Sequence, residues 1–81
     1  MPNNRYILYG TANCHLCMDA IDLIQLCDSD LDLSVIDIIV DSDLYAQYEF
    51  TIPVLKSSIS GAELNWPFIL ESLQNFLSTN Q

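Results

Sequence analysis

The alternation of apolar and polar positions divides the chain into short elements. Residues 5–9 combine β-branched and aromatic side chains and stop at a small loop, residues 10–13, which is typical of a strand. From about Asn13 to Cys27, apolar residues recur every three or four positions while polar residues take the other face. This spacing predicts an amphipathic helix directly after the loop.

The middle of the chain adds a strand and a short helix. Residues 33–40 form an almost continuous apolar run, which predicts a strand covered on both faces. Residues 41–43 supply helix-capping side chains. The helix that follows should end before Pro53, because the residue preceding a proline favours extended geometry. The apolar side chains expected on this helix are Leu44, Tyr45, Tyr48 and Phe50.

The last third of the chain predicts a β-hairpin followed by a helix. Residues 54–56 and 59–64 are two extended pieces joined by two serines. Trp66 and Pro67 then open a helix, with the proline tolerated in its first turn. The apolar face of this helix is expected to hold Ile69, Leu70, Leu73, Phe76 and Leu77.

The predicted order is strand, helix, strand, helix, strand, strand, helix, or βαβαββα. Strand–helix–strand units require parallel pairing with a right-handed crossover, whereas the hairpin is antiparallel. We therefore expect an α/β fold built on a four-stranded mixed sheet with helices on both faces. Because no repeat or linker interrupts the chain, residues 1–81 are expected to form a single domain.

Composition and charge restrict the partners of this fold. Apolar residues make up 51% of the chain, so it should fold alone. Two basic against eleven acidic residues give a formal charge of −9, which argues against nucleic acid, anionic membranes and anionic small molecules. A basic protein partner suits this charge, although the simpler interpretation is that it keeps a small hydrophobic domain soluble.

The sequence shows no targeting segment and no membrane span. Its first residues lack the pattern of a secretory signal, and its apolar runs fall far short of the roughly 20 residues that cross a bilayer. We therefore expect a soluble, cytoplasmic protein. In that reducing compartment, three cysteines are expected to be catalytic or metal-binding rather than a structural disulfide framework.

Cys14 and Cys17 lie where the first loop becomes a helix. Helical residues three apart are roughly 5–6 Å from one another, within reach of a disulfide. Cys14, near the positive end of the helix dipole, is the candidate nucleophile, and Cys17, on the apolar face, would resolve a mixed disulfide. The alternative is that both are packing cysteines, which explains Cys17 better than Cys14.

The neighbours of this dithiol have two interpretations each. His15 either stabilises the thiolate as an imidazolium or is a plain exposed residue.

With Cys27, the motif offers four metal ligands, but Cys27 lies about 15 Å along a continuous helix from Cys17, so we expect no shared metal. Cys27 is more simply a buried residue, with a regulatory or intermolecular thiol as the alternative.

Two motifs indicate a family. The chain places Cys14-His15-Leu16-Cys17 in its first βαβ unit and Thr51-Ile52-Pro53-Val54 before its hairpin. Together they resemble the thioredoxin superfamily and most closely the glutaredoxins, from Tyr6 to Leu77. The ending Leu64-Asn65-Trp66-Pro67-Phe68 is similar to that of short bacterial glutaredoxin-like proteins with a C-H-x-C dithiol. The resemblance identifies a glutaredoxin-like domain with a thioredoxin-like fold.

The resemblance also implies roles for individual residues. Isolated X–Pro bonds are cis in only about 5% of cases, but in this family the proline is cis and faces the dithiol. The resemblance implies that Pro53 is cis and faces the dithiol. It also implies a backbone contact from Ile52 to an extended thiol substrate and a supporting role for Thr51. Trp66 either walls the same groove or packs in the core.

The chain departs from typical glutaredoxins where they hold glutathione. They place a lysine where this chain has Thr11, and a paired-glycine and acidic motif where it has residues 61–67. We therefore expect no tightly bound cofactor, and these departures argue against the use of glutathione.

The leading hypothesis is a thiol–disulfide oxidoreductase that reduces or exchanges the disulfide of a protein or small molecule. One alternative is a binding or adaptor module that keeps the fold but turns over weakly or not at all. Another is a metal or iron–sulfur site that bridges two chains through Cys14. We expect a monomer in the absence of such a bridge.

Overall fold

The computed structural model describes residues 5–80, and its elements follow the predicted order. The first half contains strand β1 (Arg5–Gly10), helix α1 (His15–Cys27), strand β2 (Asp32–Asp37), a single 3-10 turn η1 (Ile38–Val40) and helix α2 (Ser42–Tyr48). The second half contains strand β3 (Val54–Ser57), strand β4 (Glu63–Asn65) and helix α3 (Leu70–Thr79).

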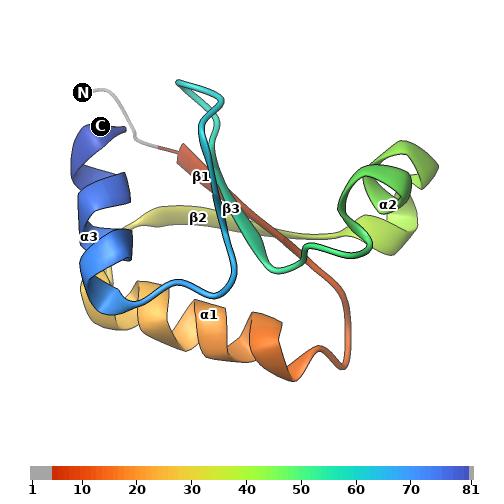
Figure 1. Ribbon diagram of the computed structural model, residues 1–81, viewed down its shortest axis with the longest axis horizontal. Coiled ribbons are helices and arrows are strands. Elements are labelled where there is room, and N and C mark those ends of the chain that lie inside the picture. The colour runs from red at the N-terminus through yellow and green to blue at the C-terminus, as the bar shows by residue number, and fades with distance from the viewer. Residues whose placement is uncertain (1–4, 81) are drawn as a thin grey trace.

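The four strands form one mixed sheet in the order β2-β1-β3-β4. β1 pairs in parallel with β2 and antiparallel with β3, which pairs antiparallel with β4. Gly10 lies opposite Asp37, and Tyr9 lies opposite Val54. The ends of β1 and β2 and the beginning of β3 therefore meet at one end of the sheet, where α1 begins (Figure 1).

Helices cover both faces of the sheet, as predicted. Helices α1 and α3 cover one face and bury a cluster of apolar side chains: Tyr6, Leu8, Ala20, Ile24, Leu55, Phe68, Leu73 and Leu77. Helix α2 and the η1 turn cover the other face with a smaller cluster: Tyr9, Ile38, Tyr48 and Val54. Neighbours in β1 belong to different clusters because successive side chains of a strand point to opposite faces.

Tyr48 connects α2 to the sheet. Its ring stacks on Tyr9, with the ring centroids 4.4 Å apart, and its hydroxyl donates to the Glu63 carboxylate at 2.5 Å. Burial, followed by this hydrogen bond, raises the pKa of the Tyr48 phenol. These contacts hold the end of α2, and with it the chain leading to Pro53, against β1 and β4.

The prediction of a doubly covered strand over residues 33–40 is wrong in two respects. β2 is an edge strand, and Val35 in its middle is 55% exposed. The strand also stops at Asp37, whose carboxylate accepts the backbone N–H of Ile39 at 3.0 Å and so begins the η1 turn. Ile39 and Val40 consequently lie at the surface.

The closing hairpin and helix also differ from prediction. Ile59 belongs to an exposed turn rather than to a strand, because Gly61 N–H bonds to the Ser57 carbonyl and closes the turn. α3 begins at Leu70, three residues after Pro67, where Ser72 Oγ accepts the Ile69 N–H. Ile69 and Leu70 are exposed as a result, and Phe68 is buried in their place.

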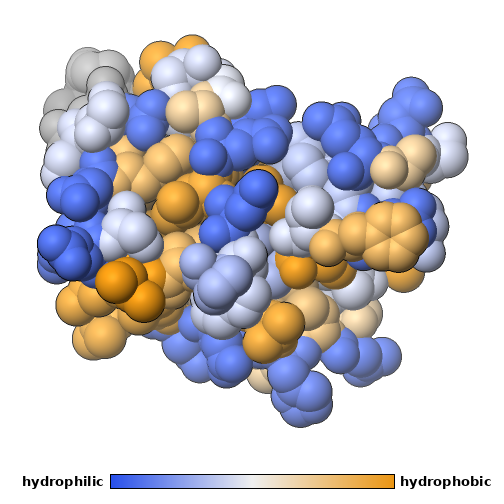
Figure 2. All heavy atoms as spheres, viewed as in Figure 1, coloured by the Kyte–Doolittle hydropathy of each residue, from blue (hydrophilic) through white to orange (hydrophobic). Residues whose placement is uncertain are grey.

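The surface of residues 5–80 carries apolar side chains among hydrophilic ones (Figure 2). Phe50 lies just beyond α2 and is 90% exposed, so it does not extend the apolar face of that helix as expected. Leu26 of α1 is 75% exposed. No helix within these residues has the length and apolar character needed to cross a membrane.

Candidate active site

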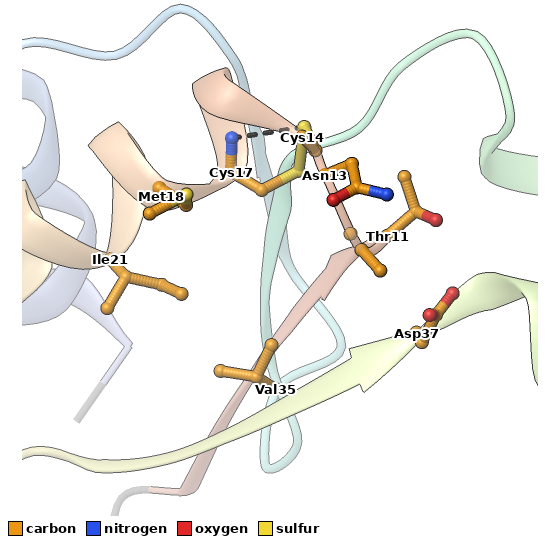
Figure 3. Close-up of a pocket in the computed structure, with 10 residues that line it drawn as sticks. Thr11, Asn13, Cys14, Cys17, Met18, Ile21, Val35 and Asp37 are labelled. Atoms are coloured by element: carbon orange, nitrogen blue, oxygen red, sulfur yellow. Dashed lines mark hydrogen bonds between the residues drawn. A yellow bond between two sulfur atoms is a disulfide. The ribbon is translucent and has the colours of Figure 1, made fainter.

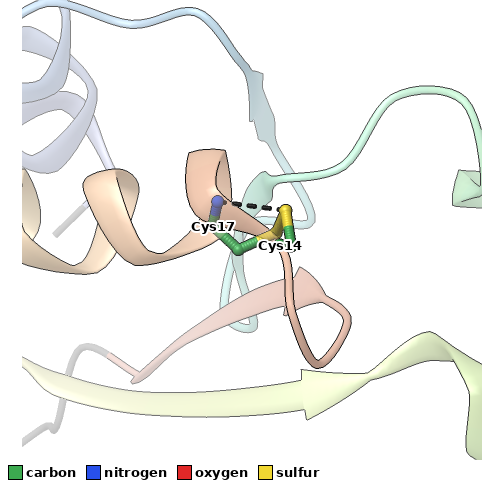
Figure 4. The surroundings of a disulfide bond; sticks show 2 residues. All are labelled: Cys14 and Cys17. Atoms are coloured by element: carbon green, nitrogen blue, oxygen red, sulfur yellow. Dashed lines mark hydrogen bonds between the residues drawn. A yellow bond between two sulfur atoms is a disulfide. The ribbon is translucent and has the colours of Figure 1, made fainter.

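A disulfide joins Cys14 and Cys17 at the start of α1 (Figure 4). Their Cα atoms are 5.2 Å apart, within the range that a disulfide bridges. Cys14 is partly exposed, whereas Cys17 is only 5% exposed. Cys14 is therefore the more accessible of the two cysteines.

Cys14 is the N-cap of α1, one residue after the predicted helix start at Asn13. Its backbone is extended, and its Sγ accepts the N–H of Cys17 at 3.1 Å (Figure 4). Asn13 adopts the left-handed conformation with φ of 65°, which asparagine tolerates better than most residues. When the disulfide is reduced, this N–H and the positive end of the helix dipole favour a thiolate at Cys14.

Gly10 ends β1 directly beneath the buried cysteine. A Cβ atom at this position would lie 2.9 Å from Cys17 Sγ and 3.2 Å from Cys17 Cβ. Separations this short force one of the two groups to move. Glycine is therefore what allows the disulfide to pack against the end of the strand.

The substitution Gly10→Ala is expected to destabilise the oxidised protein by about 1–3 kcal/mol through this overlap. The loss should be smaller after reduction, because the free Cys17 side chain can rotate away. Urea unfolding of both redox forms measures the difference. Gly61→Ala is the matched control: Gly61 has φ of 79° but nothing within 4 Å of its Cβ position. Gly61→Ala should lower the stability of the oxidised and the reduced protein equally. Equal losses for Gly10→Ala in the two redox forms would contradict the predicted overlap with Cys17.

The other residues of the motif lie at the surface or further along the helix. His15 is the first residue of α1 and is exposed. Cys27 is the last residue of α1 and a half-buried free thiol. Burial, followed by the Asp28 carboxylate, raises the pKa of the Cys27 thiol. No group of three or more His, Cys, Asp or Glu side chains within residues 5–80 has the arrangement of a metal site.

Pro53 lies at the same end of the sheet as the dithiol, since the next residue, Val54, pairs with Tyr9 at the end of β1. The Ile52–Pro53 peptide bond is cis, and Pro53 is buried. The N–H groups of Thr51 and Ile52 both donate to the carbonyl of Tyr48, at 3.0 and 3.2 Å. The Ile52 N–H is therefore already paired within the chain, and the substrate contact expected of Ile52 stays a prediction.

Trp66 supports this segment from β4. Its backbone N–H donates to the Pro53 carbonyl at 3.1 Å. Its half-buried ring packs edge-on against Phe68, with the centroids 5.0 Å apart, and contacts the larger core cluster. Trp66 thus fixes Pro53 through its backbone and contributes to the core through its ring.

A hollow of about 270 Å³ lies beside the dithiol, between the start of α1 and the edge strand β2 (Figure 3). Its mostly apolar lining includes Cys14, Met18, Ile21 and Val35, and Asp37 lies at its end. None of the predicted substrate-binding residues, Thr51, Ile52, Pro53 and Trp66, lines it. The dithiol therefore lines this hollow, while the Pro53 segment lies at the same end of the sheet without lining it.

Apart from Cys14 and Cys17, the residues that line the hollow were not predicted from the sequence as part of a site. One signal was present: Val35 and Asp37 are two residues apart in a strand, so they share a face, and Met18 and Ile21 are one helical turn apart. These spacings become informative only when the parallel pairing of β1 and β2 places β2 beside α1.

The mixed sheet and the cysteine pair at the start of its first helix together define a thiol-redox fold of the thioredoxin-like class. A family model described as "Glutaredoxin-like domain (DUF836)" matches residues 5–78. The chain therefore belongs to this glutaredoxin-like family, and the resemblance found in its motifs is confirmed.

Solved structures agree with this assignment. The X-ray structure of XcR50 from X. campestris is 29% identical, with a TM-score of 0.82, and the match covers 94% of this chain and 99% of that one. Ne2328 from Nitrosomonas europaea is 23% identical, with a TM-score of 0.79 and coverage of 94% and 93%. Thioredoxin 1 from Thermosipho africanus is 21% identical, with a TM-score of 0.67 and coverage of 93% and 91%. The last two show the shared fold. No curated protein matches this chain.

Proposed function

We propose that this protein is a thiol–disulfide oxidoreductase in which Cys14 attacks the substrate and Cys17 resolves the intermediate. The proposal rests on the difference between the two cysteines. Cys14 is partly exposed at a helix N-cap, while Cys17 is buried one turn further along the helix. An attacking thiol must be accessible and must ionise, whereas a resolving thiol needs only to reach the first sulfur.

The reaction is a balanced two-electron exchange. The Cys14 thiolate attacks one sulfur of the substrate disulfide, forms a mixed disulfide and expels the other sulfur as a thiolate. The Cys17 thiol loses its proton to solvent, attacks Cys14 Sγ and expels the second substrate thiolate. Both leaving thiolates take up protons from water, so one substrate disulfide is reduced to two thiols while the Cys14–Cys17 disulfide forms.

A protein disulfide is the substrate class that suits this chain better than glutathione disulfide. The residues that hold glutathione in typical glutaredoxins have no counterpart at Thr11 or over residues 61–67. The formal charge of −9 also slows the approach of an anionic tripeptide. This thiol–disulfide exchange requires no cofactor.

The test uses a small neutral disulfide, bis(2-hydroxyethyl) disulfide, with the fully reduced protein. We expect two equivalents of 2-mercaptoethanol per protein molecule and formation of the Cys14–Cys17 disulfide, followed by thiol assay and mass spectrometry. A Cys27→Ser variant should react at the same rate, because Cys27 lies in the last turn of α1. Thiol release no faster than from the same concentration of free cysteine would reject the oxidoreductase in favour of the adaptor alternative.

A further inference from the structure

We infer that the hollow beside the dithiol binds the side chain of a lysine or arginine next to the disulfide of a substrate protein. This inference rests on the proposed function and adds a specificity site to it. The supporting observation is that Cys14, several apolar side chains and one carboxylate line the same hollow (Figure 3).

The shape and lining of the hollow fit such a side chain. At about 270 Å³ it is slightly smaller than the roughly 300–1,000 Å³ of sites that hold whole small-molecule ligands. Met18 and Ile21 of α1 and Val35 of β2 form its wall, and Val35 is 55% exposed. A lysine or arginine places its apolar stem along such a surface and keeps its charged head at a polar edge.

Asp37 provides that polar edge. Its Oδ1 accepts the Ile39 N–H at 3.0 Å, which fixes the carboxylate at the end of β2. Figure 3 shows Asp37 near Thr11, across the hollow from the α1 residues. A carboxylate held in this way attracts a substrate cation without first having to be ordered.

No lysine or arginine of the chain competes for Asp37. The chain has two, Arg5 and Lys56. Arg5 lies at the opposite end of β1 and pairs with Asp32, Nε to Oδ2, at 3.5 Å. Lys56 lies opposite Ile7, which packs against the α2 cluster, so its side chain is on the other face of the sheet from the hollow. Within residues 5–80, no lysine or arginine side chain pairs with Asp37, so its carboxylate is available to a basic substrate.

The hollow places the cation close to the reacting sulfur. Cys14 lines the same space as Asp37, so a substrate whose disulfide meets Cys14 has neighbouring side chains within reach of the hollow. Because Pro53 does not line the hollow, a side chain bound there leaves the Pro53 segment open to the substrate backbone. Recognition by the hollow thus selects among disulfides by the residues that flank them.

The test measures exchange rates with short peptides whose single cysteine is bonded to 2-mercaptoethanol. One position within two residues of the cysteine is lysine, norleucine or glutamate, and each position is tested in turn. Norleucine has the unbranched apolar stem of lysine without the charge. We expect the order lysine, norleucine, glutamate for at least one position, with a lysine-to-norleucine rate ratio of about three to five at physiological salt.

Asp37→Asn should reduce this ratio to about one, because asparagine keeps the oxygen that accepts the Ile39 N–H but loses the charge. A general effect on the Cys14 thiolate would change both rates equally and cancel in the ratio. The matched control is Asp32→Asn, on the same strand but roughly 16 Å away at 3.3 Å per residue, beyond the Debye length of about 8 Å at physiological salt. It should leave the ratio unchanged.

Equal rates for the three peptides at every position, or equal effects of Asp37→Asn and Asp32→Asn on the ratio, would overturn the inference while leaving the exchange chemistry in place. Absence of reaction with every peptide and with bis(2-hydroxyethyl) disulfide would instead reject the proposed function. The two failures are therefore distinguishable.

Discussion

Replacement of Cys14 by serine is expected to lower the rate of disulfide exchange by about a thousandfold or more, to the slow rate of the remaining thiols of Cys17 and Cys27. The hydroxyl of serine does not ionise in the range where a capped thiol does, and Cys17 is too buried to take over as the attacking group. The measurement is the release of 2-mercaptoethanol from bis(2-hydroxyethyl) disulfide.

Cys17→Ser should fail at a different step. Cys14 still attacks, but no thiol resolves the product, so the mixed disulfide accumulates and is detected as an adduct at Cys14 by mass spectrometry. One equivalent of thiol is released instead of two. If Cys17→Ser reacts to completion while Cys14→Ser forms the adduct at Cys17, the assigned roles are reversed and the argument from burial is wrong.

Leu8→Ala is expected to cause the largest loss of stability among single substitutions considered for this chain. Leu8 is fully buried in β1, between Val35 of β2 and Leu55 of β3. Removing a buried leucine side chain leaves a cavity and costs about 2–5 kcal/mol. For a domain of this size, that loss should lower the melting temperature by about 10–25 °C.

The matched control for Leu8→Ala is the same substitution at Leu26. Leu26 is 75% exposed on α1, and alanine is at least as favourable as leucine in a helix, so a change within about 0.5 kcal/mol is expected. Both variants should be unfolded under reducing conditions, so that the disulfide does not contribute. Equal losses at the two positions would contradict the placement of Leu8 in the core.

The order of helices and strands could be predicted from short sequence patterns, because each pattern reflects interactions between residues close together in the chain. The three- and four-residue spacing between the first loop and Cys27 gave α1, and its ending is confirmed at Cys27. The strand–helix–strand order required the parallel pairing of β1 with β2 that the sheet contains. Cys14 and Cys17 are within disulfide distance because residues three apart on a helix are neighbours.

The errors arose where a side chain overrides the hydrophobic pattern. Apolar character continues through Val40, but the Asp37 carboxylate pairs with a backbone N–H and ends the strand. Ser72 similarly sets the start of α3 beyond Pro67 by accepting the Ile69 N–H. Both are hydrogen bonds to the backbone two or three residues away, and neither changes the apolar period from which the boundary was predicted.

The dithiol was predictable from sequence, but the hollow beside it was not. The motif fixes Cys14 and Cys17 through the local geometry of one helix. The hollow combines residues about twenty positions apart, such as Met18 and Val35, which meet only through the register of β2 against β1. The role of Gly10 depends on the same tertiary packing, because its contact is with Cys17 rather than with a chain neighbour.

To test whether Cys14 and Cys17 form one reversible redox pair, the protein is equilibrated with graded thiol–disulfide buffers and its thiols are trapped for mass spectrometry. Cys27 is the internal control, because burial raises its pKa and disfavours its reactive thiolate. We expect a single two-electron transition that links Cys14 to Cys17 while Cys27 stays free. If Cys14 and Cys17 remain unlinked across the whole range, or if either pairs with Cys27 instead, they are not a reversible redox pair.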